Sequence, residues 1–101
     1  MKNYSRQTPE DAAEALAERM RRIRLAKGWK QTTLADRSGV SMASLRRFES
    51  SGRVSLQNLL KLAFALNRIA DFDFVFEAPR ATSMAELETG EAKPARKRGR
   101  L

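Results

Sequence analysis

The chain has 101 residues, enough for one small domain, and it carries a formal net charge of +8. Because it contains neither Cys nor His, it lacks disulfides, thiol nucleophiles, the commonest general base and the commonest metal ligand, and we expect no enzyme activity, metal or cofactor. Lys and Arg outnumber Asp and Glu by 20 to 12, which favours a polyanionic partner, most simply nucleic acid.

The sequence also bears on where the protein works. No uncharged run is long enough to span a membrane, and the chain begins with polar residues instead of a basic and then apolar signal. We therefore expect a cytoplasmic protein that does not contact membranes. Charge alone does not distinguish DNA, RNA and an acidic protein surface as the partner.

A first helix is predicted after a short N-terminal stretch. Residues 1–8 carry no periodic pattern and are expected to be flexible. Thr8, Pro9 and the two acidic residues that follow are typical of a helix start, because they provide a cap, a favourable backbone angle and charges that suit the helix dipole. Apolar residues then recur every three or four positions and predict one buried face: Ala13, Leu16, Met20 and Ile23. Gly28 ends this helix.

Three further helices are predicted before residue 70. The first spans residues 31–38, and after a tight turn Ser41 caps a second that runs to about residue 50. Ser55 caps the last one, whose apolar residues again follow the helical period: Leu56, Leu59, Leu62, Ala63 and Leu66. Residues 9–69 therefore predict an all-α domain of four to five helices.

The period changes to two in the segment that follows. Residues 71–76 alternate between acidic or aliphatic residues and three phenylalanines, which predicts a strand over residues 70–78 with one aromatic face: Phe72, Phe74 and Phe76. A lone strand has no hydrogen-bond partner, so we predict that it pairs with the same strand of a second copy and forms a homodimer.

The remaining residues, 79–101, lose aromatic side chains and end in a basic cluster at residues 93–100. This composition predicts a disordered basic tail. The cluster could keep the chain soluble, add phosphate contacts or dock on an acidic patch of a partner. The sequence leaves these three roles open.

The segment from Gln31 to Glu49 has the spacing of two helices joined by a tight turn. Ala35 is small enough for the second helix to cross the first steeply, and Gly39 tolerates the positive φ of the turn. Four apolar side chains fill the space between the helices: Leu34, Val40, Leu45 and Phe48. The second helix is left half outside the core, where it could enter the major groove of DNA.

These positions resemble the lambda-repressor-like, XRE-type helix-turn-helix family over residues 14–67. The residues that carry the resemblance are Arg24, Gly28, Trp29, Gln31, Leu34, Ala35, Ser38, Gly39, Val40, Ser41, Leu45 and Glu49. The resemblance implies that residues 9–69 form a DNA-binding domain. It also implies a structural salt bridge between Arg24 and Glu49.

The same resemblance implies which residues contact DNA. The second helix of the pair would contact bases through its first turns and outer face: Ser41, Met42, Ala43, Ser44, Arg46 and Arg47. Of these, Arg46 and Arg47 are the strongest candidates because arginine can donate two hydrogen bonds to guanine, whereas Met42 and Ala43 could meet a thymine methyl. Without the surrounding spacing, such arginines would ordinarily be solvated surface residues.

Phosphate contacts are implied at the start of the helix that precedes the turn. Gln31 would bind a phosphate there, with Lys30 and Arg53 as neighbouring charges. Many members of the family have Ser or Thr where Lys30 stands, so we expect a weak cap for this helix.

A helix-turn-helix domain followed by one strand also resembles HipB-type antitoxins. That resemblance implies a dimer that binds a palindromic operator in double-stranded DNA, represses its own operon and binds a HipA-like toxin kinase. A stand-alone XRE-type regulator and a protein-interaction module without DNA binding remain alternatives. RNA binding is disfavoured because the aromatic residues are expected to be buried. The operator, the toxin and any effector are not identifiable from the sequence.

Overall fold

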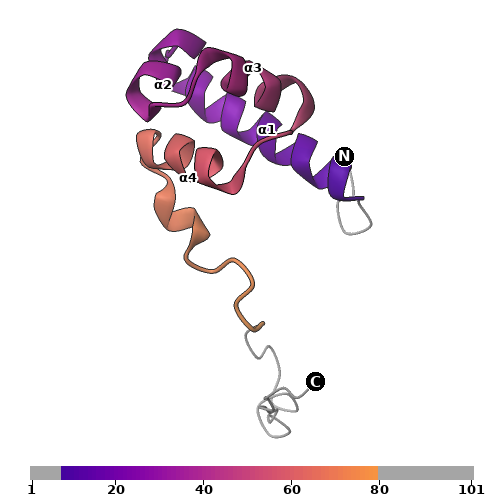
Figure 1. The fold of residues 1–101 in the computed structure, drawn as a ribbon. Coiled ribbons are helices and arrows are strands. Elements are labelled where there is room, and N and C mark those ends of the chain that lie inside the picture. The colour runs from indigo at the N-terminus through magenta and orange to yellow at the C-terminus, as the bar shows by residue number, and fades with distance from the viewer. Residues whose placement is uncertain (1–7, 80–101) are drawn as a thin grey trace, which may run out of the picture.

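The computed structural model describes residues 8–79, so residues 1–7, residues 80–101 and the basic cluster at 93–100 lie outside the described part. Four α-helices and one short 3-10 helix follow one another along the chain: α1 (Pro9–Ala26), α2 (Gln31–Ser38), α3 (Met42–Ser51), α4 (Leu56–Ala65) and η2 (Ile69–Phe72) (Figure 1). The predicted all-α domain is confirmed. None of the described helices is long and apolar enough to cross a membrane.

The helices begin where local side-chain chemistry favours it. Thr8, Ser41 and Ser55 cap α1, α3 and α4, and each hydroxyl accepts a hydrogen bond from the backbone N–H three residues later. α2 follows Lys30 without a side-chain cap, as expected. Its first backbone N–H groups are therefore left for another partner.

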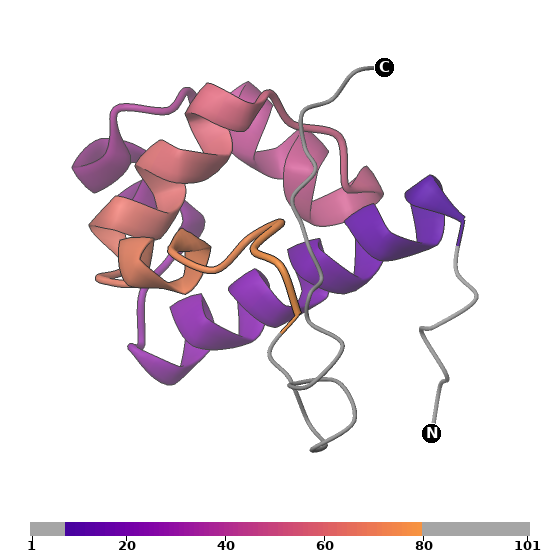
Figure 2. The same ribbon diagram turned by 90° about the horizontal axis from the view of Figure 1, so that it is seen from below.

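The core lies among all four α-helices. α2 and α3 lie together at the top of Figure 1, α4 lies below them, and α1 crosses behind; Figure 2 shows α4 above α1. The largest fully buried side chains come from α2, α3 and the α4 region: Phe48, Leu34, Leu45, Leu62 and Leu66. Burial of each stabilises the fold by roughly 1.5–3 kcal/mol, so this packing holds α3 in place.

The strand predicted for residues 70–78 is not formed in the described chain. Its first residues belong to η2, and residues 73–76 form turns, in which the N–H of Asp73 donates to Ala70 and that of Val75 to Phe72. An isolated strand would leave these donors and acceptors unpaired, whereas turns satisfy them within one chain. The period of two in the sequence was therefore not sufficient to make a strand.

The phenylalanines of this segment also differ from expectation. Phe72 packs against the core, but Phe74 is 69% exposed and Phe76 is 99% exposed. Phe64 on α4 is 73% exposed as well, so these three aromatic side chains are not buried within a single chain. Phe76 in addition has a φ of 65°, in the left-handed region that is strained for a bulky residue.

Two glycines allow a test of the packing between α1 and α3. Gly39 ends α2 with a φ of +76° and Gly52 ends α3 with a φ of +84°. A Cβ on Gly39 would meet nothing within 4 Å, whereas a Cβ on Gly52 would lie 2.8 Å from the backbone carbonyl carbon of Ala13 in α1.

We expect Gly39→Ala to lower the free energy of unfolding by about 1–2 kcal/mol, because alanine is strained at this φ. Gly52→Ala should cost about 1–3 kcal/mol more, because overlap with α1 adds to the same strain. Urea denaturation of the two variants measures the difference. Equal losses would contradict the close approach of α1 to the end of α3.

Candidate nucleic-acid interface

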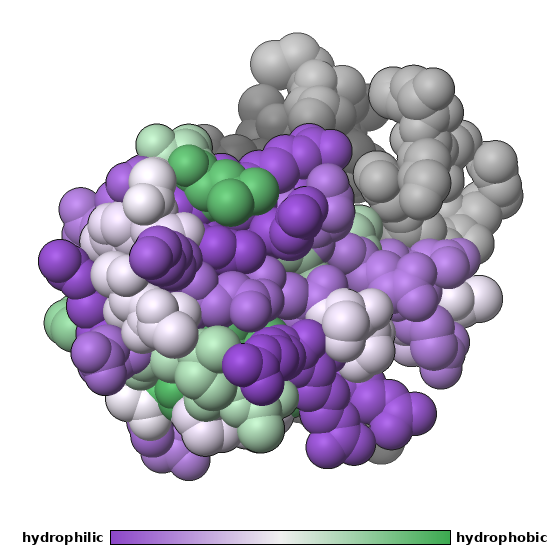
Figure 3. Space-filling model, turned by 90° about the horizontal axis from the view of Figure 1, so that it is seen from above, coloured by the Kyte–Doolittle hydropathy of each residue, from purple (hydrophilic) through white to green (hydrophobic). Residues whose placement is uncertain are grey.

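α3 presents one polar face to solvent. Ala43, Arg46 and Arg47 are exposed, and their spacing of three and four residues places them on the same side of the helix. Figure 3 shows the domain from the side of α2 and α3, and this surface is mainly hydrophilic. The geometry therefore presents both predicted arginines together.

A shallow groove beside α3 brings together side chains from three helices. Arg21 comes from α1, Gln31 comes from α2, and the rest of the lining comes from α3: Ala43, Arg46, Arg47, Glu49 and Ser50. Four of the residues predicted to contact DNA thus converge here: Gln31, Ala43, Arg46 and Arg47.

A second hollow lies between α3 and the start of α4. Its lining includes Ser44, Arg47 and Arg53, together with the cap residue Ser55 and Asn58 of α4. Arg47 borders both hollows. It therefore lies at the centre of the predicted contact surface, and Arg53 lies beside it.

Three of the residues predicted to contact DNA are less well placed to do so. Met42 is half-buried and packs against the core. The Ser41 hydroxyl caps α3 and lies 3.0 Å from the Ser44 hydroxyl. Lys30 is exposed at the start of α2 but belongs to neither lining. Among the α3 residues, the geometry favours Ala43, Arg46 and Arg47 for base contacts.

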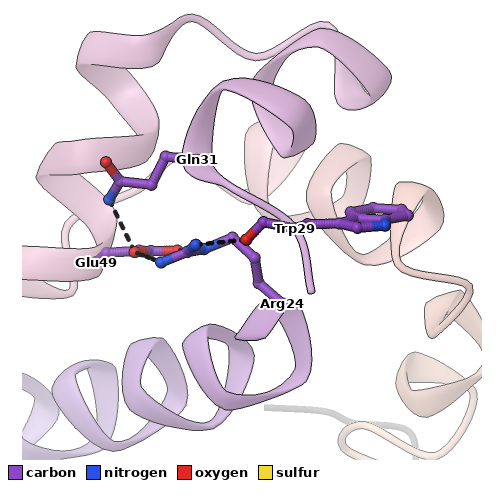
Figure 4. Close-up of polar contacts among 4 residues, drawn as sticks. All are labelled: Arg24, Trp29, Gln31 and Glu49. Carbon is purple, nitrogen blue, oxygen red and sulfur yellow. Dashed lines mark hydrogen bonds and ion pairs between the residues drawn. The ribbon is translucent and has the colours of Figure 1, made fainter. Parts of the chain in front are cut away.

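A buried salt bridge joins α3 to α1. Arg24 Nε lies 2.8 Å from Glu49 Oε2, and Arg24 Nη2 donates to Glu49 Oε1 at 2.9 Å (Figure 4). The two side chains are only 7% and 5% exposed. This is the bridge that the family resemblance implied, and its two parallel bonds fix the orientation of α3 as well as its position.

Two further hydrogen bonds complete this network. Arg24 Nη1 donates to the carbonyl of Trp29 at 2.9 Å, and Gln31 Nε2 donates to Glu49 Oε1 at 2.9 Å. Figure 4 shows Arg24 and Gln31 converging on Glu49. The Gln31 side chain therefore already has a partner on α3. The uncapped backbone N–H groups at the start of α2 are better placed than this side chain to donate to a phosphate.

Contacts of the Trp29 ring also hold the loop between α1 and α2. The Trp29 ring points away from Glu49 in Figure 4, with the Arg37 guanidinium 4.6 Å and the Lys27 ammonium 5.4 Å from its centroid. Both distances suit cation–π attraction. Because Trp29 precedes Gln31 by two residues, this packing also positions the start of α2.

Sequence reasoning missed two features of this surface. The hydrogen bond from Gln31 to Glu49 joins residues 18 positions apart, and no local pattern predicts it. Arg21 is one of several arginines in α1, and its helical spacing from Arg24 was the only signal that it could lie near α3.

Comparison with known proteins agrees with this geometry. A family model described as helix-turn-helix matches residues 20–70, half of the chain. The matched residues include all of α2, α3 and α4. The chain has no match among curated proteins.

Proposed function

The chain belongs to the helix-turn-helix family, whose members are typically DNA-binding regulators, and we propose that it is a sequence-specific transcriptional repressor rather than an enzyme. The observation that carries this proposal is that Arg46 and Arg47 are both exposed on α3 and line one groove beside it. α3 would lie in the major groove of the operator, where its exposed arginines could donate paired hydrogen bonds to guanine.

The buried bridge supports this use of α3. Base contacts require side chains held to within a fraction of an ångström, and helices braced by buried partners meet that requirement better than loops. Glu49 is buried against Arg24 and bonded to Gln31, while Arg46 and Arg47, three and two residues earlier, are exposed. One side of α3 is thus held by buried partners, while the other side is exposed and able to contact DNA.

Phosphate contacts would flank the base contacts. The uncapped start of α2, beside Lys30, offers backbone N–H groups on one side of α3. Arg53 lies in the second hollow, near the start of α4, on the other side. Such contacts would supply much of the affinity and make it dependent on salt.

DNA selection tests this function. An operator would be selected from random duplexes with the purified chain, and fluorescence anisotropy would compare its affinity with that of an unselected duplex. We expect a preference of about 10³-fold or more at physiological salt. Equal affinities would contradict sequence-specific binding, and no retention on DNA even at low salt would favour a protein-interaction module.

We also propose that the repressor is a homodimer on a palindromic operator. Ile69, Phe74, Val75 and Phe76 are exposed apolar residues in and after η2, and Val75 also lines a cleft between α1 and η2. The cleft is lined mainly by apolar side chains: Leu16, Met20, Ile23, Ala63, Phe72 and Val75. In a two-fold dimer, the exposed aromatic residues of each copy could fill the cleft of the other.

Substitution of two exposed phenylalanines tests this dimer. Phe74→Ser/Phe76→Ser should shift the chain towards the monomer in sedimentation equilibrium, with circular dichroism unchanged because neither side chain is in the core. Phe64→Ser is the matched control, since Phe64 is exposed to about the same extent as Phe74 but belongs to α4 and not to the segment after η2. A dimer that survives the double substitution would contradict this interface.

The antitoxin role is a narrower proposal within the same function. It rests on the resemblance to HipB-type antitoxins, which implies a HipA-like toxin kinase as partner. Co-expression with a kinase encoded next to this gene, followed by size-exclusion chromatography, tests it. A stable complex that represses transcription would support the antitoxin role, and the absence of both kinase gene and complex would favour a stand-alone regulator.

A further inference from the structure

Arg21 occupies an unexpected place, because it belongs to α1 and yet lines the groove beside α3. It is exposed and takes part in none of the three salt bridges formed among residues 8–79. Its neighbours are used differently: Arg22 pairs with Glu18 at 3.3 Å, and Arg24 is buried against Glu49. Among the arginines of α1 in the described part of the chain, Arg21 is thus the one whose exposed charge lines this groove.

The charges of the groove favour an anion. Its one acidic residue, Glu49, is matched by Arg24 at 2.8 Å and also accepts a hydrogen bond from Gln31. The remaining charged residues of the lining are Arg21, Arg46 and Arg47, all exposed. Three exposed positive charges around one depression attract a polyanion and repel a cationic ligand.

The position of Arg21 distinguishes its role from that of the α3 arginines. A helix in the major groove has a phosphate backbone on each side, and residues of neighbouring helices meet those backbones. Arg21 shares the groove with Gln31, which lies at the start of α2. We propose that Arg21 binds a backbone phosphate on the strand that the start of α2 faces, an inference that rests on the proposed DNA binding.

The expected effect follows from the nature of a phosphate contact. Loss of this contact should weaken binding to every duplex, on the order of tenfold for each contact at low salt, and should reduce the slope of log affinity against log salt by about one for each bound protomer, or about two for the proposed dimer. The preference for the selected operator over an unselected duplex should stay unchanged, because a phosphate carries no sequence information.

Arg21→Gln, with Arg22→Gln as the matched control, tests the inference. Both substitutions remove one exposed positive charge from the same helix, but Arg22 is paired with Glu18 and does not line the groove. Anisotropy titrations on the selected operator and on an unselected duplex would be repeated from about 50 to 200 mM salt. Arg21→Gln should lose about one unit of slope for each bound protomer, Arg22→Gln should keep the wild-type slope, and Arg21→Lys should retain most of it.

Each failure has a distinct signature. If Arg21→Gln keeps the wild-type affinity and slope while the wild type binds its operator, the role of Arg21 is overturned and the proposed function stands. If the loss is confined to the selected operator, Arg21 contacts a base, and the phosphate assignment is wrong. If the wild type binds no DNA, the proposed function is overturned together with this inference.

Discussion

Replacement of Arg46 and Arg47 together by alanine is expected to abolish the preference for the operator and to leave the helical fold intact. Both side chains are exposed on the outer face of α3 and line the groove. Each arginine that donates two hydrogen bonds to guanine contributes about 1–3 kcal/mol of discrimination, so the double substitution should cost roughly 30-fold to 10⁴-fold in specific affinity for each half-site.

The unchanged fold is part of this prediction, because exposed substitutions away from buried partners usually alter stability by no more than about 0.5 kcal/mol. Arg46→Lys/Arg47→Lys is the informative control. Lysine keeps the charge but lacks the rigid planar pair of donors, so this variant should retain affinity for any duplex while losing part of the preference for the operator. Wild-type operator affinity in the alanine double variant would refute the assignment of these residues.

Glu49→Ala should have the largest effect on stability. The substitution leaves Arg24 buried without its counter-charge and removes the acceptor of the Gln31 amide. Breaking a buried pair in this way costs about 3–5 kcal/mol, a large part of the 5–15 kcal/mol typical of a folded protein. Thermal and urea denaturation measure the loss. Glu18→Ala, which breaks the exposed pair with Arg22, should cost about 0–1 kcal/mol.

Replacement of both Arg24 and Glu49 separates the effect of losing their salt bridge from the effect of leaving Arg24 buried without a counter-charge. Arg24→Met/Glu49→Leu removes both charges and fills the site with apolar side chains, so it should be more stable than Glu49→Ala. Its operator affinity should still fall, because the bond that holds Gln31 to α3 is lost as well. A loss of stability in Glu49→Ala no larger than in Glu18→Ala would contradict a buried brace.

The start of each α-helix and the position of the turn were predictable from the sequence. Ser41 and Ser55 cap α3 and α4 through bonds to backbone groups three residues away, and Gly39 takes the left-handed φ that the turn requires. These features depend on chemistry within one turn of the chain, so a local pattern is enough to indicate them. The outer face of α3, with Arg46 and Arg47, followed from the same spacing.

Tertiary structure decided the features that join distant segments. The alternation around Phe74 indicated a strand, but a strand needs a neighbour, and one described chain satisfies its backbone by turns instead. The bond from Gln31 to Glu49 and the place of Arg21 beside α3 both require three helices packed together. The sequence by itself determined where the α-helices begin and that Arg46 and Arg47 face outward, because those features depend on neighbours along the chain. Packing determined which side chains meet, because residues from α1, α2 and α3 come within reach only in the folded domain.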